Sequence, residues 1–436
     1  MLMSRGQGFS AQLRAMIASG LWSLVLRIAG LFSGFALGVL LARTLGPKEF
    51  GIYGLVTTAA AVGMTIAQLG TPQLAVRELS VRSAGGDWSS VKAIIRQFAI
   101  AVATAGVAVG LVALAGGALA GASVLDLTLI VQGSLLALLT ALTALLGAEL
   151  RGLGALLKGQ AMDIAARPAV TFLIVAALLL AGSRMSASIA LVISNLVTLA
   201  AVAVSALWLW RAVPRGVATG APVPWLRAAL PLGAVDVLRQ FDGSYGVVLV
   251  GWLASGIELG VFRVALASAV LAAMPVTIVH VLLAPTLSRL HAAGDTREMQ
   301  RVLSWAATGL TAIMLPIALA AWFIGKPLII LVFGAAYADA WLPLFLLTLA
   351  QTIYALFGMG PVLLAMCDGE RDLIRIYAIA VGSAVLAAIP LTMAWGGAGA
   401  ACAPLISASL IGLMARGYAR RALGLEITPI PARAAA

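Results

Sequence analysis

The stretch LLARTLGPKEFGIYG, residues 40–54, joins two long apolar runs through a short polar break. Gly46 and Pro47 lie at the centre of the break, and Lys48 and Glu49 follow them. Glycine commonly ends a helix, proline is favoured in the first turn of a helix, and an acidic side chain is favourable near a helix N-terminus. The stretch therefore predicts a tight hairpin in which Gly46 ends one helix and Pro47 opens the next.

The composition of the whole chain is that of a membrane protein. Of its 436 residues, 62% are hydrophobic and only 10% are charged, and the mean hydropathy is +1.08. A typical soluble domain has about 25% charged residues. Apolar runs of 20 or more residues recur along the chain, whereas the strands of a transmembrane β-barrel are about 10 residues long and alternate in polarity. The sequence therefore excludes both a soluble protein and a barrel.

These runs predict an all-α integral membrane fold with twelve transmembrane helices. The expected spans are 21–42, 52–76, 93–119, 124–148, 161–182, 187–210, 228–253, 260–287, 303–325, 341–366, 373–395 and 398–419. The connection at 211–227 is rich in proline and glycine and divides the spans into two groups of six. We therefore expect an N-terminal lobe (1–210), a linker (211–227), a C-terminal lobe (228–421) and a tail (422–436).

Basic residues are distributed unevenly between the two sides of this topology. Of the 28, 21 fall on the side that holds both termini, four fall on the other side, and three lie inside spans. Loops rich in lysine and arginine stay in the cytoplasm, so both termini are predicted to be cytoplasmic. The net charge of +12 comes from these short loops, which argues against a nucleic-acid binding surface.

The opening stretch recurs faintly in the second half of the chain. Residues 42–54 align with GWLASGIELGVFR, residues 251–263, 209 positions further on. The aligned pairs are Glu49 with Glu258, Gly51 with Gly260 and Tyr53 with Phe262. In each half the segment joins the first span to the second on the external side. Two halves of six spans share one orientation, which predicts pseudo-two-fold symmetry about the membrane normal and a cavity between the lobes.

Several stretches, in order along the chain, resemble one known family. They are LARTLGPKEFGIYG (41–54), LGTPQLAVRELS (69–80), GVFRVALA (260–267), LLAPTLSRL (282–290), GKPLIILVFGAAYADA (325–340) and LLAMCDGERDLIRI (363–376). The chain is thereby similar to the polysaccharide-biosynthesis flippases, the O-antigen and exopolysaccharide transporters of the MATE-like (multidrug/oligosaccharidyl-lipid/polysaccharide) superfamily.

The resemblance implies a function as well as a fold. It implies two lobes of six helices that alternate access and move a polyprenyl-pyrophosphate-linked oligosaccharide from the cytoplasmic to the periplasmic leaflet. The product serves surface polysaccharide assembly, such as lipopolysaccharide or exopolysaccharide, and the membrane is the bacterial cytoplasmic (inner) membrane. The glycan does not carry over from the family, and whether a polysaccharide polymerase is a partner stays open.

The seventh span carries the densest charge inside the membrane. Asp236, Arg239 and Asp242 lie in LPLGAVDVLRQFDGSYGVVLVGW. At 100° per residue, Arg239 shares a face with the glycines at 243 and 246, while Asp236 and Gln240 flank it on one side and Asp242 on the other. Because intramembrane charge usually marks function, we predict that Arg239 and Gln240 bind substrate and that Asp236 and Asp242 couple transport to a proton or sodium ion. A structural pairing of Arg239 with the aspartates is the alternative.

Two further arginines and a glutamine are candidate substrate ligands. Arg27 lies in span 1 beside several glycines, close enough to the cytoplasmic end to snorkel instead. Arg263 opens span 8 near the outer face, where anchoring at the interface competes with substrate binding. The resemblance favours both arginines, since related flippases place cavity arginines in their first and eighth helices. Gln68 either lines the cavity or holds helices together, as does Gln351.

Other polar residues have simpler interpretations. Asp163 and Arg167 are spaced i, i+4 at the start of span 5, which predicts a pair on the helix surface. His280 lies well off the face of Arg263, and we expect a structural hydrogen bond there. The two cysteines lie on opposite faces of the predicted membrane, and no zinc or haem spacing occurs.

The charge inventory separates the function classes. A MATE-like drug or small-molecule/cation antiporter is the alternative, but the first four spans offer no mid-span carboxylate, and Arg27 favours an anionic substrate. A membrane glycosyltransferase or polymerase needs acidic or histidine clusters in sizeable external loops, whereas this chain has two histidines and short external loops. We therefore expect a transporter rather than an enzyme, with no catalytic residue, metal or cofactor.

Overall fold

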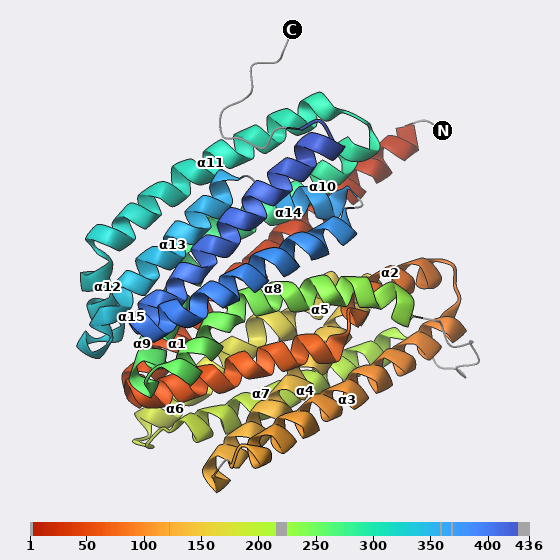
Figure 1. Cartoon of the computed structure of the whole chain (residues 1–436). Helices are drawn as coiled ribbons and strands as arrows, with labels where there is room; N and C mark the ends of the chain where they lie inside the picture. Colours follow the sequence, from red (N-terminus) through yellow and green to blue (C-terminus); the bar gives the residue numbers. More distant parts are fainter. Residues whose placement is uncertain (1–2, 122, 215–224, 358–359, 368, 426–436) are drawn as a thin grey trace. The chain divides into compact units, whose positions relative to one another are not determined.

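A computed structural model describes residues 3–121, 123–214, 225–357, 360–367 and 369–425. Every element in these ranges is a helix (Figure 1). In chain order they are α1 (Met3–Gln68), α2 (Thr71–Ala84), α3 (Trp88–Leu119), α4 (Val124–Gly152), α5 (Leu156–Gln160), η1 (Ala161–Ala166), α6 (Arg167–Leu180), α7 (Ala187–Ala212), α8 (Leu226–Leu253), α9 (Gly256–Ala272), α10 (Met274–Ala292), α11 (Thr296–Phe323), α12 (Gly325–Phe333), η2 (Ala335–Ala340), α13 (Trp341–Leu356), α14 (Gly360–Met366) and α15 (Glu370–Ala422).

Most of these helices are long and apolar enough to cross a membrane. Eight qualify by length and composition among the described residues, or nine if the bent pair of α9 and α10 counts as one span. The helices α1 and α15 each continue across a break and cover two predicted spans, and α8 carries the charges of the predicted seventh span. The chain is thus a multi-pass all-α membrane protein, and the number of spans stays a prediction.

The outer surfaces of these helices suit a lipid environment. Large apolar side chains are exposed along them, including Leu111, Leu173, Trp252, Leu331 and Leu386. A soluble protein would bury many of these groups, whereas lipid tails solvate them without cost.

The hairpin predicted from the opening stretch is present within α1. Gly46 has φ 72° and ψ 172°, a non-helical conformation that breaks the helix, and Pro47 follows as the first residue of the next segment. A positive φ is strained for residues with a Cβ atom, so glycine suits this position. The prediction that Gly46 ends one helix and Pro47 opens the next is confirmed.

Two compact units make up the chain. Unit 1 contains residues 1–37 and 63–233, and unit 2 contains residues 38–62 and 234–436. The hairpin thus packs with the C-terminal half of the chain, and α1 and α8 each contribute to both units. The predicted linker 211–227 lies largely outside the described residues, as does most of the tail 422–436. The lobe boundaries therefore stay a prediction.

Unit 1 is built around α4, which packs lengthwise against α3 and α7 (Figure 1). Its apolar core joins α2, α3 and α4, with the fully buried side chains of Leu79, Ile94, Phe98 and Leu145 at its centre. Phe98 also meets Trp225 edge to face, with ring centroids 5.8 Å apart. These contacts fix the start of α8 to the helices of unit 1.

Unit 2 is built around α13, which packs against α11 and α15 (Figure 1). One core lies between α8 and α15, around Tyr245, Tyr377 and Ile411. A second core joins α10, α11 and the end of α15, around Leu287, Leu303 and Met314. The polar groups described below lie between these two cores.

Side chains cap several helix ends. Ser123 and Asp126 bond each other reciprocally at the start of α4, a capping box. Asp87 caps α3 by accepting a hydrogen bond from the backbone N–H of Ser90 at 3.1 Å. Hydrogen bonds from Ser90 and Ser89 lower the pKa of the Asp87 carboxyl, so this cap stays ionised at neutral pH.

The two copies of the weak repeat pack directly on each other in unit 2. A Cβ atom built on Gly51 would lie 2.7 Å from the carbonyl oxygen of Gly256 and 2.9 Å from the amide nitrogen of Gly260. A Cβ atom on Gly260 would collide with the carbonyl oxygen of Pro47. Glycine in both copies therefore lets the backbones of α1 and α9 touch, a close approach that any side chain prevents.

Three predicted boundaries are wrong. Span 52–76 is interrupted at Leu69 and Gly70, whose positive φ values end α1 before α2 begins. Residues 326–340, expected to form an external loop, are helical in α12 and η2. Span 260–287 bends by 46° between α9 and α10, where Pro275 lies in the first turn of α10. Local backbone conformations decide these breaks, and hydropathy does not report them.

Replacing Gly260 with alanine is expected to destabilise the protein, because the new methyl group must push α1 and α9 apart. Alanine normally favours a helix over glycine by about 1 kcal/mol, but the collision with Pro47 should reverse the sign and cost about 2 kcal/mol. Thermal unfolding of the purified protein in detergent measures the effect. Gly309→Ala in α11 is the matched control, because a Cβ atom there meets nothing within 4 Å. Equal stability of the Gly260→Ala variant and the parent would contradict the proposed contact.

Candidate functional site

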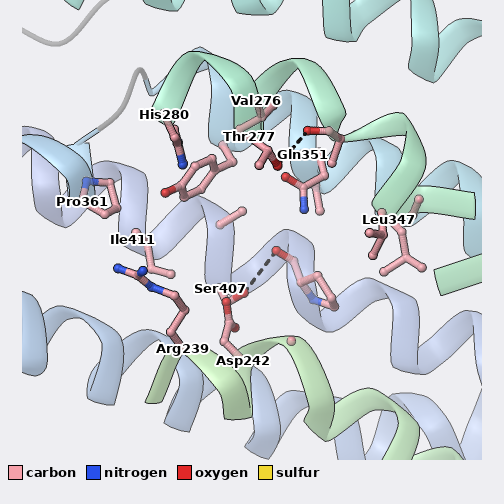
Figure 2. A pocket seen from close by; sticks show the side chains of 18 of the residues that line it. Arg239, Asp242, Val276, Thr277, His280, Leu347, Gln351, Pro361, Ser407 and Ile411 are labelled. Carbon is pink, nitrogen blue, oxygen red and sulfur yellow. Dashed lines mark hydrogen bonds between the residues drawn. The ribbon is translucent and has the colours of Figure 1, made fainter. Parts of the chain in front are cut away.

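A polar cavity lies inside unit 2, among α8, α9, α10, α13, α14 and α15. Its volume is about 420 Å³, within the range of small-molecule sites. Its polar lining includes Arg239, Asp242, His280, Gln351, Tyr354 and Tyr377, and apolar side chains such as Leu347 and Ile411 complete the wall (Figure 2). We call this space the α8 cavity, because α8 supplies both of its charged residues.

The charged face of α8 points into this cavity as the periodicity predicts. Arg239, Asp242 and Gly243 line the space together. Gly246, expected on the same face, is instead buried against the ring of Phe262. A Cβ atom built on Gly246 would lie 3.0 Å from Cζ of that ring. The polar sector is therefore shorter than predicted and ends one turn before the glycine contact.

The guanidinium of Arg239 stands at the centre of an aromatic and acidic environment. It lies within hydrogen-bonding reach of the hydroxyl of Tyr377 and within electrostatic reach of Tyr354 and Asp236. Tyr354 in turn lies within hydrogen-bonding reach of Tyr377. Phenol groups orient an arginine without neutralising it, which leaves donors for an anionic ligand.

The second charged group of the cavity is less well satisfied. Oδ1 of Asp242 is buried and has no hydrogen-bond partner among the described residues. Ser407 lies beside this carboxyl (Figure 2), but its hydroxyl also donates to the carbonyl oxygen of Pro404 at 3.3 Å. An unpartnered carboxyl oxygen facing a cavity is a position at which a proton or a cation can bind.

The other two predicted residues of span 7 lie outside the cavity lining. Gln240 donates a hydrogen bond from Nε2 to Oγ of Ser244 at 2.8 Å, on its own helix. Asp236 interacts electrostatically with Arg239. Gln240 therefore bonds within its own helix, and Asp236 lies near Arg239 without lining the cavity.

Part of the polar lining of the α8 cavity was not predicted from the sequence. His280 was expected to make a structural hydrogen bond, but its Nε2 is buried with no partner among the described residues. Its ring packs on Tyr354, with centroids 5.6 Å apart, and it lines the cavity (Figure 2). Tyr354 and Tyr377 were not predicted; a polar-tipped aromatic within an apolar run is the only sequence signal for either. Gln351 lines the cavity, as suggested.

Arg263 belongs to the contact between α1 and α9 rather than to the α8 cavity. Its Nη1 donates to Oγ1 of Thr58 at 2.9 Å, and its side chain lies over Gly54. Its Nε is buried without a partner among the described residues. The structure therefore gives Arg263 a packing role, and substrate binding by Arg263 stays a prediction.

Arg27 and Gln68 belong to unit 1. Both carry a buried nitrogen without a partner among the described residues, Nε in Arg27 and Nε2 in Gln68. The predicted substrate ligands are thus divided between the two units. Within the described residues no group of three or more metal-ligating side chains occurs.

One buried carboxyl lies near the C-terminal end of α4. The helix α4 extends to Gly152, past the predicted end of span 4 at 148, and so includes Glu149. Its side chain is fully buried, and neither carboxyl oxygen has a hydrogen-bond partner among the described residues. Glu149 lies in the last turns of α4 and not at its middle, so the absence of a mid-span carboxylate from the first four spans stays a prediction.

The long apolar helices and the cavity in unit 2 are those of a multi-pass membrane protein with an internal polar site. The family model described as "Polysaccharide biosynthesis protein" matches residues 40–342, and the chain belongs to that family. Comparison with curated proteins finds no match.

Solved structures with a similar fold include membrane transporters and a lipid flippase. The chain is similar to a multidrug resistance MATE family transporter of the MOP superfamily in its inward-facing conformation, at 11% identity, with a TM-score of 0.70 and coverage of 93% of this chain and 98% of that one. It is also similar to the lipid II flippase MurJ in an inward closed conformation, at 16% identity, with a TM-score of 0.69 and coverage of 93% and 87%. At these identities the likeness concerns the fold, and the predicted MATE-like fold is confirmed.

A further relative in fold is a MOP superfamily transporter from Pyrococcus furiosus, with 13% identity and a TM-score of 0.62. Coverage is 93% of this chain and 95% of that one. Its structure is described as having a binding pocket of reverse polarity that suggests a different function. One fold therefore accommodates pockets of different charge, and the substrate has to be argued from the residues.

A cysteine at position 243 is expected to react with a water-soluble maleimide, because Gly243 is exposed to the cavity and a Cβ atom there meets nothing within 4 Å. The background replaces the native Cys367 and Cys402 with serine. Gly246→Cys, one turn along α8 and buried against Phe262, is the matched control. We expect Gly243→Cys to label roughly tenfold faster, since thiol reactivity follows access to water. Equal rates would mean that the α8 cavity is not open to solvent.

Proposed function

We propose that this protein is a flippase that moves a polyprenyl-pyrophosphate-linked oligosaccharide from the cytoplasmic to the periplasmic leaflet for surface polysaccharide assembly. The observation that carries the proposal is Arg239, a guanidinium facing a polar cavity inside a membrane-embedded unit of a polysaccharide biosynthesis family member. A charge in that position is costly and is retained where it serves a ligand.

The chemistry of the substrate fits arginine. A pyrophosphate presents several anionic oxygens, and a guanidinium binds such oxygens through two parallel N–H bonds while it stays charged. The aromatic rings of Tyr354 and Tyr377 beside Arg239 add surfaces on which sugar rings can pack. A cavity of about 420 Å³ holds part of a head group, and the polyprenyl chain remains in the lipid.

Transport against a gradient needs a source of free energy. Asp242, with a carboxyl oxygen available to bind a proton or sodium ion, is the proposed coupling group. Asp236 interacts electrostatically with Arg239. One elementary charge that crosses 100 mV supplies about 2.3 kcal/mol, which biases the cycle roughly fiftyfold. We propose that protonation or ion binding at Asp242 alternates with occupancy of Arg239 by the anionic head group.

The proposed orientation follows from the basic loops. Both termini lie in the cytoplasm, and the membrane is the bacterial cytoplasmic membrane. The transported molecule enters from the leaflet in which lipid-linked glycans are built. Membrane lipids are the remaining proposed partners.

A drug or small-molecule/cation antiporter is the second candidate. Glu149 favours it, since a buried carboxyl without a partner inside the N-terminal helices is a group that can exchange a proton for a cationic substrate. The two functions differ in the charge of the substrate. An antiporter for cations is expected to depend on Glu149 and to tolerate the loss of Arg239.

Replacing Arg239 with glutamine is expected to slow leaflet transfer of a fluorescent polyprenyl-pyrophosphate glycan in proteoliposomes by about 10- to 100-fold, because charge-assisted hydrogen bonds to the pyrophosphate are lost. Arg239→Lys should retain part of the rate, since charge stays but the planar fork is lost. Arg301→Gln is the control, because that arginine is exposed and pairs with Glu298 at 2.7 Å. Unchanged rates in both Arg239→Gln and Arg27→Ala would refute the flippase site.

Collapsing the ion gradients separates coupled from uncoupled transfer. We expect that dissipating the proton or the sodium gradient abolishes net transfer in the parent protein, because the ion supplies the free energy. Asp242→Asn should leave slow, gradient-independent equilibration, since the amide cannot exchange a proton. Transfer that is insensitive to both gradients in the parent would eliminate Asp242 as the coupling group.

A further inference from the structure

Three arginines from three helices of unit 1 lie next to a single turn of π-helix. Arg27 lies in α1, Arg151 in the last turn of α4, and Arg167 at the start of α6. The π-helix η1, Ala161–Ala166, leads directly into Arg167. We call these three residues the arginine cluster. π-Helical turns are rare and occur often at functional sites, where the extra residue redirects side chains.

Packing contacts bring α1 onto this turn. Oγ of Ser23 donates to Oε1 of Gln160 at 2.6 Å, just before η1 begins. Three residues after Arg27, on the same face, α1 touches η1 so closely that a Cβ atom on Gly30 would collide with the carbonyl oxygen of Ile164. Arg27 lies between Ser23 and Gly30 and therefore on the face of α1 that covers η1.

The side chain of Arg151 reaches the same turn from α4. Its Nη1 donates to the carbonyl oxygen of Gly159 at 3.3 Å, and its stem lies against Gly159. It interacts electrostatically with two other members of the site, attracted by Asp163 and repelled by Arg27. A repulsion between two arginines inside a helical unit is unfavourable unless an anion lies near both.

The cluster has more donors than the protein satisfies. Nε of Arg27 and Nη1 of Arg167 are buried and have no hydrogen-bond partner among the described residues. The i, i+4 pair predicted between Asp163 and Arg167 is not formed, since no ion pair within 4 Å joins them in the described part of the chain. The wider turn of η1 explains this, because side chains four apart no longer align as they do in an α-helix.

The excess charge of the cluster is two. The cluster holds three guanidinium groups, and Asp163 in η1 supplies one carboxylate, which attracts Arg151. Each arginine side chain keeps part of its surface exposed. Glu149 lies two residues before Arg151 on α4, so it points to nearly the opposite side of that helix. A linked diphosphate with an ester at each end carries two negative charges at neutral pH, one on each phosphate, which matches the cluster.

We propose that the arginine cluster binds the diphosphate of a lipid-linked head group, as a site in unit 1 separate from Arg239. The inference rests on the proposed function for the identity of the substrate, and it adds Arg151 and Arg167 as ligands. Guanidinium groups from three helices can contact both phosphates at once, whereas a single phosphate leaves one of them without an acceptor. On the proposed topology the cluster lies near the cytoplasmic surface, where a newly made substrate enters.

Direct binding by the full-length protein in nanodiscs tests this site. The probes are farnesyl diphosphate esterified at its free end to N-acetylglucosamine, which carries two charges as the proposed head group does, farnesyl monophosphate and added phosphatidylglycerol, each titrated by calorimetry. We expect the diphosphate to bind about tenfold more tightly than the monophosphate, and Arg151→Gln and Arg167→Gln each to weaken it about tenfold. Lys158→Gln is the matched control, since this lysine is basic, exposed and next to Gly159. It should leave the affinity unchanged.

Lysine variants separate a binding role from a structural one. Arg151→Lys and Arg167→Lys keep the charge and lose the planar fork, so we expect intermediate affinities with thermal stability close to that of the parent. Unchanged diphosphate affinity in the glutamine variants would overturn the proposal. Equal affinity for phosphatidylglycerol and the diphosphate would also overturn it, because the cluster would then be a phospholipid site.

Failure of this inference is distinguishable from failure of the proposed function. If the diphosphate binds at the cluster but no glycan lipid is transferred in proteoliposomes, the site stands and the flippase function falls. If transfer proceeds and depends on Arg239, while Arg151→Gln and Arg167→Gln bind and transfer normally, the function stands and the site falls.

Discussion

The contact on which unit 2 depends is the backbone approach of α1 to α9 at Gly51 and Gly260. Apolar helices gain little from association in lipid, because lipid tails are as apolar as leucine, so close packing and hydrogen bonds must hold them together. The two glycines let the backbones of α1 and α9 touch directly, and Arg263 adds a hydrogen bond to Thr58 beside this contact. Residues 38–62 consequently pack with the C-terminal half of the chain, and the hairpin at Gly46 makes this exchange possible.

The apolar environment of the membrane also explains the composition of the polar cavity. A charge inside a membrane-embedded unit needs partners that stabilise it, and α8 meets this need with tyrosines from α13 and α15 around Arg239. Tyrosine contributes an apolar ring to the core and a hydroxyl to the cavity, so the wall packs without neutralising the guanidinium. The cavity lies between the two apolar cores of unit 2, which leave space where Arg239 and Asp242 project.

Basic side chains are used in different ways along one chain. Arg263 lies in a helix contact, Arg301 pairs with Glu298 on an exposed surface, and Arg239 faces a cavity. Arg27, Arg151 and Arg167 lie beside η1 with one carboxylate, Asp163, and both Arg27 and Arg167 keep a buried donor without a partner among the described residues. Counting arginines in the sequence therefore describes topology, whereas the number of acceptors around each one determines which can bind an anion.

The sequence by itself determined the membrane class, the hairpin at Gly46, the charged face of α8 and the family, because long apolar runs, Gly-Pro pairs and helical periodicity are local properties. It also pointed to Arg239 and Asp242, since a charge in an apolar run is visible without a structure. It could not place His280, Tyr354 or Tyr377 in one cavity, nor show that Glu149 is buried or that Arg27, Arg151 and Arg167 lie beside the same π-helical turn. Those outcomes depend on which helix faces meet. Such contacts between helices far apart in the sequence leave no periodic signal in the chain.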